Sequence, residues 1–176
     1  MQLWSFRGSY SISKAYETML NRDHATPKWK FLMWSNITVP KHSFVLFLAL
    51  HNGLSTNDNI MRRGISMANR CVLCSGAIET INHLFFECQV AHKVWQQILT
   101  WAGIRRRPLS ISHELKRALH CRVSATVKRR IAMLAACVYH IWIERNGRIF
   151  SGKSRPLESI VQAIITEGSW GLKLNM

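Results

Sequence analysis

CVLCSGAIETINHLFFECQVAH, residues 71–92, gathers three cysteines and two histidines within 22 residues. Cys71 and Cys74 form a CxxC pair, whose two-residue gap lets both thiolates reach one ion from a tight turn. A thioredoxin-like redox pair has the same spacing but needs a βαβ context, which is missing here. Buried free cysteines are a further alternative, but so dense a group of Cys and His favours a metal. We therefore predict a bound Zn²⁺.

The fourth ligand of this site can be chosen in two ways. One set is Cys71, Cys74, His83 and Cys88, with the spacing C-x2-C-x8-H-x4-C. The other set replaces His83 with His92, which follows Cys88 by one helical turn. Spacing alone does not decide between them. Either set surrounds the ion with protein ligands and leaves no open position for water, so the predicted zinc is structural.

Helix signals dominate on both sides of the metal region. Proline, capping residues and closing glycines predict four helices. The first runs from Pro40 to about Asn52 and is followed by Gly53, and the second runs from Thr56 or Asn57 to Arg63 and is followed by Gly64. The third is capped by Thr80 and carries His83, and the fourth runs from Ala91 to Ala102 and is followed by Gly103. A short helix is also expected at about 14–20. The aromatic-rich segment 29–37 is ambiguous between strand and helix.

The longest periodic segment lies nearer the C-terminus. Apolar residues at helical spacing between Val127 and Trp142 predict an amphipathic helix from about Ala125 to Arg145, stopped at Asn146-Gly147. Cys121 and Cys137 are expected to be bystanders. Cys137 lies beside the apolar stripe of this helix, where a free cysteine behaves as a small hydrophobic residue. The predicted fold class is mainly α: a small helical domain built around a Cys3His zinc site, with a long C-terminal amphipathic helix.

These elements suggest a division of the chain into four parts. We expect a helical zinc-binding domain over 1–103, a basic linker over 104–124, a long connecting helix over 125–150, and a C-terminal tail with a short helix over 151–176. No internal repeat and no low-complexity tract interrupt the pattern.

Charge gives the strongest global signal. The 176 residues carry a formal net charge of +15, which favours polyanionic partners, nucleic acid before membrane surfaces. Residues 101–150 hold eleven Lys/Arg against Glu114 and Glu144 only, so this span contributes +9 of the total. The predicted nucleic-acid contacts are two clusters: Arg105, Arg106 and Arg107, and Lys128, Arg129 and Arg130. Such contacts hold phosphates without reading sequence.

Several classes of function are disfavoured. Asp23 and Asp58 are the only aspartates, too few for the metal sites of a polymerase and a nuclease together. No HExxH-like or triad-like pattern surrounds the glutamates, so we expect no enzyme. The apolar runs are too short to span a bilayer and no secretory signal opens the chain, so an intracellular location, nucleus or cytoplasm, and no membrane contact are expected.

The metal region also resembles a known family. It is similar to the zinc-binding domain that follows the reverse transcriptase in plant non-LTR (LINE-type) retroelements, or retrotransposons. The positions that carry this similarity are residues 71–74, Glu79-Thr80, His83–Phe86, Cys88 and Val94-Trp95. The resemblance begins near Trp4. It continues downstream through Tyr139–Trp142 and Glu144–Asn146, which resemble the helix leading to a ribonuclease H domain.

This resemblance implies a role and selects a ligand. In the family the third ligand is the histidine before Leu-Phe, which favours His83 over His92. The resemblance implies a non-catalytic accessory domain that binds RNA or DNA, with a reverse transcriptase or ribonuclease H domain as a further partner. The alternative is a protein-interaction module that docks on a polymerase or nuclease.

Overall fold

The computed structural model describes residues 38–65, 69–119 and 125–169. These residues form α-helices and one π-helical turn, in the order α3 (Pro40–Leu50), α4 (Asn57–Arg62), η1 (His83–Glu87), α5 (Gln89–Trp101), α6 (Ile111–Leu119), α7 (Ala125–Ser151) and α8 (Leu157–Gly168). Within the described ranges, the only β feature is an isolated antiparallel bridge between Arg70 and Ile78. The predicted mainly α fold class is confirmed. The expectations for 14–20, 29–37 and Cys121 lie outside the described residues.

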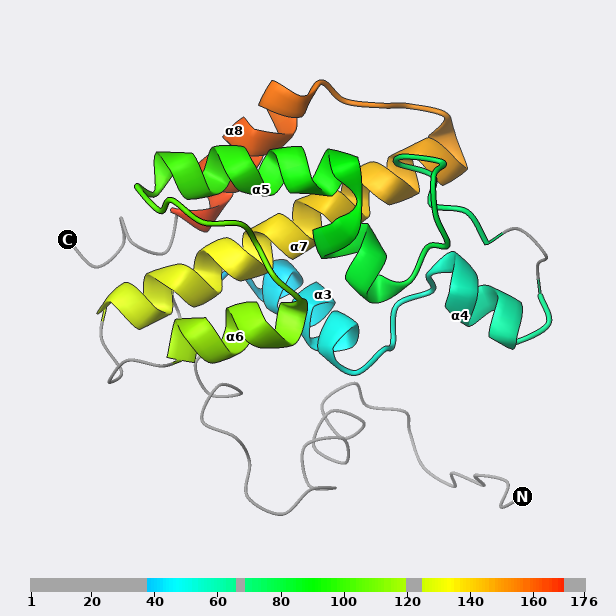
Figure 1. Cartoon of the computed structure of the whole chain (residues 1–176), viewed down its shortest axis with the longest axis horizontal. Coiled ribbons are helices and arrows are strands. Elements are labelled where there is room, and N and C mark those ends of the chain that lie inside the picture. The colour runs from blue at the N-terminus through cyan, green and yellow to red at the C-terminus, as the bar shows by residue number, and fades with distance from the viewer. Residues whose placement is uncertain (1–37, 66–68, 120–124, 170–176) are drawn as a thin grey trace, which may run out of the picture.

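Helix α7 forms the centre of the fold. It runs diagonally through the molecule between α3 and α6 on one side and α5 and α8 on the other, and it contacts all four as well as η1 (Figure 1). Every residue from Ile131 to Val138, including Cys137, is buried. The middle of α7 is therefore covered on all sides, and its charged side chains lie toward the two ends of the helix.

The C-terminal end of α7 differs from the prediction. The helix does not stop at Asn146-Gly147 but continues to Ser151, and Gly152 then takes a left-handed conformation with φ +61°. Glu144 and Arg148 form an i,i+4 ion pair across this stretch at 2.8 Å. A glycine inside a helix costs only about 1 kcal/mol, which such contacts and the packing of the helix offset.

Helix α3 ends two residues earlier than predicted. Asn52, not Gly53, takes the left-handed position with φ +54°. The N–H of Gly53 bonds to Leu48 O at 2.7 Å and the N–H of Asn52 to Ala49 O at 3.3 Å. These two bonds define a Schellman motif in which asparagine replaces the usual glycine.

Helix α6 is not predicted from the sequence. It lies within residues 104–124, which were expected to be a linker, and its Ile111 and Leu115 are buried where α6 packs on α7. Only a two-turn apolar stripe marks this helix among many basic residues. The division of the chain into domains stays a prediction.

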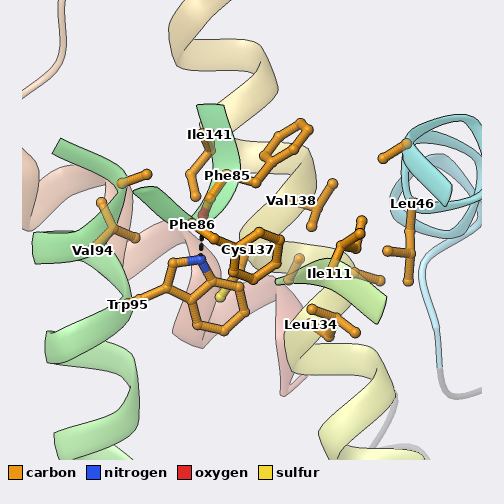
Figure 2. Close-up of a cluster of buried hydrophobic side chains, with 14 of the residues drawn as sticks. Leu46, Phe85, Phe86, Val94, Trp95, Ile111, Leu134, Cys137, Val138 and Ile141 are labelled. Atoms are coloured by element: carbon orange, nitrogen blue, oxygen red, sulfur yellow. Dashed lines mark hydrogen bonds between the residues drawn. The ribbon is translucent and has the colours of Figure 1, made fainter. Parts of the chain in front are cut away.

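The core joins the metal region to the helices. Figure 2 shows Phe85, Phe86 and Trp95 beside Cys137, Val138 and Ile141 of α7, all of them buried. The Trp95 indole N–H donates to Phe85 O at 2.7 Å, so its polar atom is satisfied inside the core. Among the described residues, no helix is long and apolar enough to cross a membrane.

Candidate metal centre

The structure brings Cys71, Cys74, His83 and Cys88 together. One donor atom from each lies within 4.8 Å of the other three. Cys71 Sγ and Cys88 Sγ are 3.9 Å apart, and Cys74 Sγ is 3.3 Å from His83 Nε2. All three cysteines are free thiols, since a disulfide would need sulfurs about 2.05 Å apart. Cys71, Cys88 and His83 are buried, and Cys74 is half-buried.

A tight turn positions the first two cysteines. The N–H of Ser75 bonds to Cys71 O at 2.7 Å, and the N–H of Cys71 bonds to Ala77 O at 2.8 Å. The bridge between Arg70 and Ile78 closes the loop behind them. Ser75, and not the neighbouring Gly76, takes the left-handed backbone with φ +56°. The turn thus directs both thiols to one side, as the CxxC spacing predicts.

The other two donors lie at the ends of the π-helical turn. Thr80 caps the helical segment that begins at Ile81 and continues into this turn: its hydroxyl oxygen accepts the His83 N–H at 3.0 Å, as predicted. The Cys88 N–H bonds to His83 O at 2.7 Å, and Cys88 then begins α5 as its N-cap residue. One extra residue in this turn places His83 and Cys88 next to the CxxC pair. Leu84, Phe85 and Phe86 anchor the turn in the core.

The donor set fits zinc. Tetrahedral Zn²⁺ with Zn–S of about 2.3 Å and Zn–N of about 2.0 Å requires donor separations of about 3.8 Å (S to S) and about 3.5 Å (S to N). The two measured separations, 3.9 Å and 3.3 Å, are close to these values. The hydrogen bond to Cys88 and burial raise the pKa of the Cys71 thiol, while the same hydrogen bond lowers the pKa of Cys88. A bound Zn²⁺ would displace the thiol protons, because zinc is held by thiolates.

His92 is not part of this cluster. It lies half-buried on α5, and its N–H bonds to Cys88 O at 2.8 Å. One helical turn separates Cys88 and His92 as the spacing indicates, but Cys88 is the cap of that helix and not within it. The structure therefore assembles the first of the two predicted sets.

A buried ion pair docks the CxxC loop on α7. Glu79 and Arg145 are each at most 2% exposed, and Arg145 Nη2 lies 2.8 Å from Glu79 Oε1. Asn57 joins both: its N–H donates to Glu79 Oε1 at 2.9 Å, and its Oδ1 accepts from Arg145 Nη2 at 3.1 Å. Arg148 Nη1 donates to Leu73 O at 3.2 Å. These contacts fix the loop to the C-terminal end of α7.

This role of Arg145 is not predicted from the sequence. Arg145 and Arg148 are two of the eleven basic residues of 101–150, yet Arg145 is buried. A signal was present, because Arg145 follows Val138 and Ile141 at helical spacing and so continues the apolar stripe of α7. A charged residue in such a stripe indicates a buried partner.

The two predicted basic clusters meet at one pocket. A cavity of about 540 Å³ between α5, α6 and α7 is lined by residues that include Arg106, Arg117, Arg129, Arg130 and Trp101. Arg117 and Arg129 are exposed, and Trp101 is 51% exposed. A flat aromatic ring and several guanidinium groups thus border the same hollow. Arg117 and Trp101 were not among the predicted contacts.

Arg106 differs from its neighbours in the first cluster. Arg105 and Arg107 are exposed, but Arg106 donates to both carboxylate oxygens of buried Glu114 at 2.6 Å. Although burial opposes ionisation, the hydrogen bonds from Arg106 and from the Leu109 N–H lower the pKa of Glu114. Arg106, one of the predicted nucleic-acid contacts, is thus ion-paired within the protein, whereas Arg105 and Arg107 are exposed.

Comparisons with known proteins agree with this geometry. Residues 10–95 match the family described as zinc-binding in reverse transcriptase. A candidate ribonuclease H protein of Arabidopsis thaliana is 24% identical over 102 residues, which cover 54% of this chain and 16% of the relative. No solved structure matches.

The family match and the Cys3His cluster together support zinc as the cofactor. The matched segment ends within α5 and contains all four clustered donors, while α6, α7 and α8 lie beyond it. The resemblance drawn from the cysteines and His83 is thereby confirmed: residues 10–95 match the zinc-binding domain of reverse transcriptases.

Proposed function

We propose that Cys71, Cys74, His83 and Cys88 hold one structural Zn²⁺. The convergence of four donor atoms within 4.8 Å of one another supports this assignment. When bound, the ion supplies cross-linking and charge neutralisation, and four protein ligands leave no position for a reacting water. The CxxC loop, the π-helical turn and the start of α5 would thus be fixed to one point.

Metal analysis of His83→Ala and His92→Ala tests the ligand set. Wild-type protein and His92→Ala should carry the same amount of zinc by mass spectrometry, because His92 lies outside the cluster. His83→Ala should carry less zinc than either protein, because one ligand of the Cys3His centre is removed. A zinc-replete His83→Ala protein together with a depleted His92→Ala protein would contradict the proposal.

We further propose that the chain is a non-catalytic accessory domain that holds nucleic acid at the basic pocket. The observation that carries this is the grouping of Arg117 and Arg129 with exposed Trp101 around one cavity. Guanidinium groups bind phosphates, and an exposed indole stacks on unpaired bases. Single-stranded RNA or DNA, bound without sequence preference, fits this combination.

Salt dependence of binding tests the role of the charges. Each lost phosphate contact should lower the slope of log affinity against log salt by about 0.7 for single strands. Arg117→Ser combined with Arg129→Ser should therefore flatten the slope by about 1.4 and weaken all sequences alike. Arg63→Ser combined with Lys153→Ser is the matched control, since both are exposed and neither lines the pocket.

Trp101→Ala tests stacking separately from charge. Affinity should fall by about 1–3 kcal/mol with an unchanged salt slope, because no phosphate contact is removed. Phe44→Ala removes another exposed ring, 49% exposed, on α3 and should leave binding unaltered. Wild-type affinity in both the Trp101 and the double arginine variants would exclude the pocket as the binding site.

A protein-docking role is the second candidate. Ile143, Ile149 and Phe150 are exposed near the end of α7, and Phe150 is 79% exposed. Exposed apolar side chains are typical of an interaction surface where they form a contiguous patch. If RNA and DNA bind only weakly and without salt dependence, docking on a polymerase or nuclease partner becomes the better explanation.

A further inference from the structure

A second cluster of metal-ligating side chains lies in the interface of α3, α7 and α8. His42 comes from α3, His140 from α7 and Glu167 from α8, and one donor atom from each lies within 4.8 Å of the other two. His42 Nε2 is 3.0 Å from Glu167 Oε2, and His140 Nε2 is 3.5 Å from Glu167 Oε1. These residues share no side chain with the Cys3His cluster.

A close approach of α8 to α7 brings Glu167 to this place. A Cβ atom at Gly168 would lie 2.6 Å from Met133 Sδ and 3.3 Å from the Ala136 Cβ, which is too close for any other residue without displacement. The absence of a side chain at Gly168 therefore lets the two helices pack tightly. The neighbouring Glu167 then reaches the two histidines.

The two ring nitrogens of His140 lack a hydrogen-bond partner among the described residues. His140 is 3% exposed, and neither ring nitrogen makes a hydrogen bond within the described residues, since the contact with Glu167 is long at 3.5 Å. An unsatisfied polar group in a core is costly, and a metal bond satisfies an imidazole nitrogen. Burial lowers the pKa of His140 to about 4, so the ring is neutral at physiological pH. Neutral imidazole is the form that binds metals.

We propose that His42, His140 and Glu167 form a second metal site that takes Zn²⁺ or a similar divalent transition metal. Two imidazoles and one carboxylate are a ligand set that zinc uses, with three protein ligands and one position left for water. The site would tie together the first, central and last described helices. It differs from the Cys3His centre in having no sulfur donor.

Two cationic side chains lie near the cluster. Lys41 Nζ lies 2.8 Å from Glu167 Oε2, and Arg155 Nη2 donates to His140 O at 3.1 Å. The Lys41 side chain is 50% exposed and also lies 4.9 Å from the Tyr139 ring centroid, so it can turn to solvent when a metal takes its place. Lys41 thus acts as a competitor of the metal.

Cobalt titration of the full chain distinguishes the two sites. Co²⁺ bound at the Cys3His centre gives a thiolate charge-transfer band, and Co²⁺ at the second site does not. Wild-type protein should bind two equivalents, only one of them with this band. His140→Asn and Glu167→Gln should each lose the equivalent without the band and keep the other. His113→Asn and Glu158→Gln, at exposed positions, serve as controls and should bind two.

Lys41→Gln gives a readout that a structural role would not predict. Removing the competing ammonium should tighten the second equivalent by up to about fivefold, the strength of an exposed ion pair. A single equivalent in wild type, or a second one that persists in both His140→Asn and Glu167→Gln, would overturn the proposal. Loss of the thiolate band in wild type would instead count against the Cys3His centre, so the two failures are distinguishable.

Discussion

The two ends of α7 are similarly basic, yet their arginines have different roles. At the C-terminal end, Arg145 is 2% exposed and ion-paired with Glu79, which is fully buried. At the N-terminal end, Arg129 is exposed and lines an open pocket. A buried guanidinium stays charged and therefore needs a buried partner to offset its desolvation, whereas an exposed one is available to a phosphate. Burial, and not the number of charges, therefore separates the structural arginines from the candidate binding ones.

Of the changes that test this difference between the two ends of α7, removing the metal should have the largest effect on folding stability. In zinc-finger peptides, structural zinc supplies about 10–16 kcal/mol of folding free energy. Chelation should therefore unfold residues 70–88 and break the Glu79–Arg145 ion pair, because Glu79 lies within this segment. Hydrogen exchange should show lost protection there and around Arg145, while the middle of α7 stays protected. Equal protection with and without zinc would show that the ion is not needed for the fold.

Breaking the buried pair should have the next largest effect. Arg145→Ala leaves Glu79 charged and buried without its partner, which costs about 3–5 kcal/mol in unfolding free energy. Urea unfolding measures this loss. The double variant Arg145→Met with Glu79→Leu should recover part of it, because no charge is then left buried. If Arg145→Ala is as stable as Arg129→Ala, the contrast between the two ends is wrong.

Acid pH tests the pair formed by Arg106 and Glu114. The pKa of Glu114 is lowered in the folded protein, so the pair stabilises the fold above the ordinary glutamate pKa. This stabilisation is lost as the pH falls through the lowered pKa. The difference in unfolding free energy between wild type and Glu114→Gln should be constant from pH 7 to about pH 5 and shrink at lower pH. Taking the difference cancels the acid release of zinc, which both proteins share.

The smallest effect on stability is expected at Arg105 and Arg107. Both are exposed, so Arg105→Ser with Arg107→Ser should change the unfolding free energy by no more than about 0.5 kcal/mol. Adding Arg106→Ser should lower stability further, because buried Glu114 loses its bidentate partner. Thermal unfolding of the double and triple variants compares the two. If the triple variant is as stable as the double variant, Arg106 contributes no more to stability than the exposed Arg105 and Arg107.

Local chemistry was enough to predict much of this protein. The CxxC spacing, the Thr80 cap and the closing glycines Gly64 and Gly103 act within a few residues, and the structure has each of them where the sequence indicates. The long helix and the burial of Cys137 follow from apolar periodicity alone. The cofactor followed from donor types, since three thiols and an imidazole select zinc over harder ions.

Other features depend on residues far apart in the chain. Glu79 and Arg145 are 66 positions apart, and His42 and Glu167 are 125 apart, so no local pattern joins them. Spacing alone left His83 and His92 open, and the family resemblance favoured His83. The structure adds the physical reason, because the π-helical turn makes Cys88 the cap of α5 and leaves His92 outside the cluster. Residue types and short spacings fixed which chemistry was possible. Tertiary packing decided which side chains meet, because burial and pairing are properties of the folded chain.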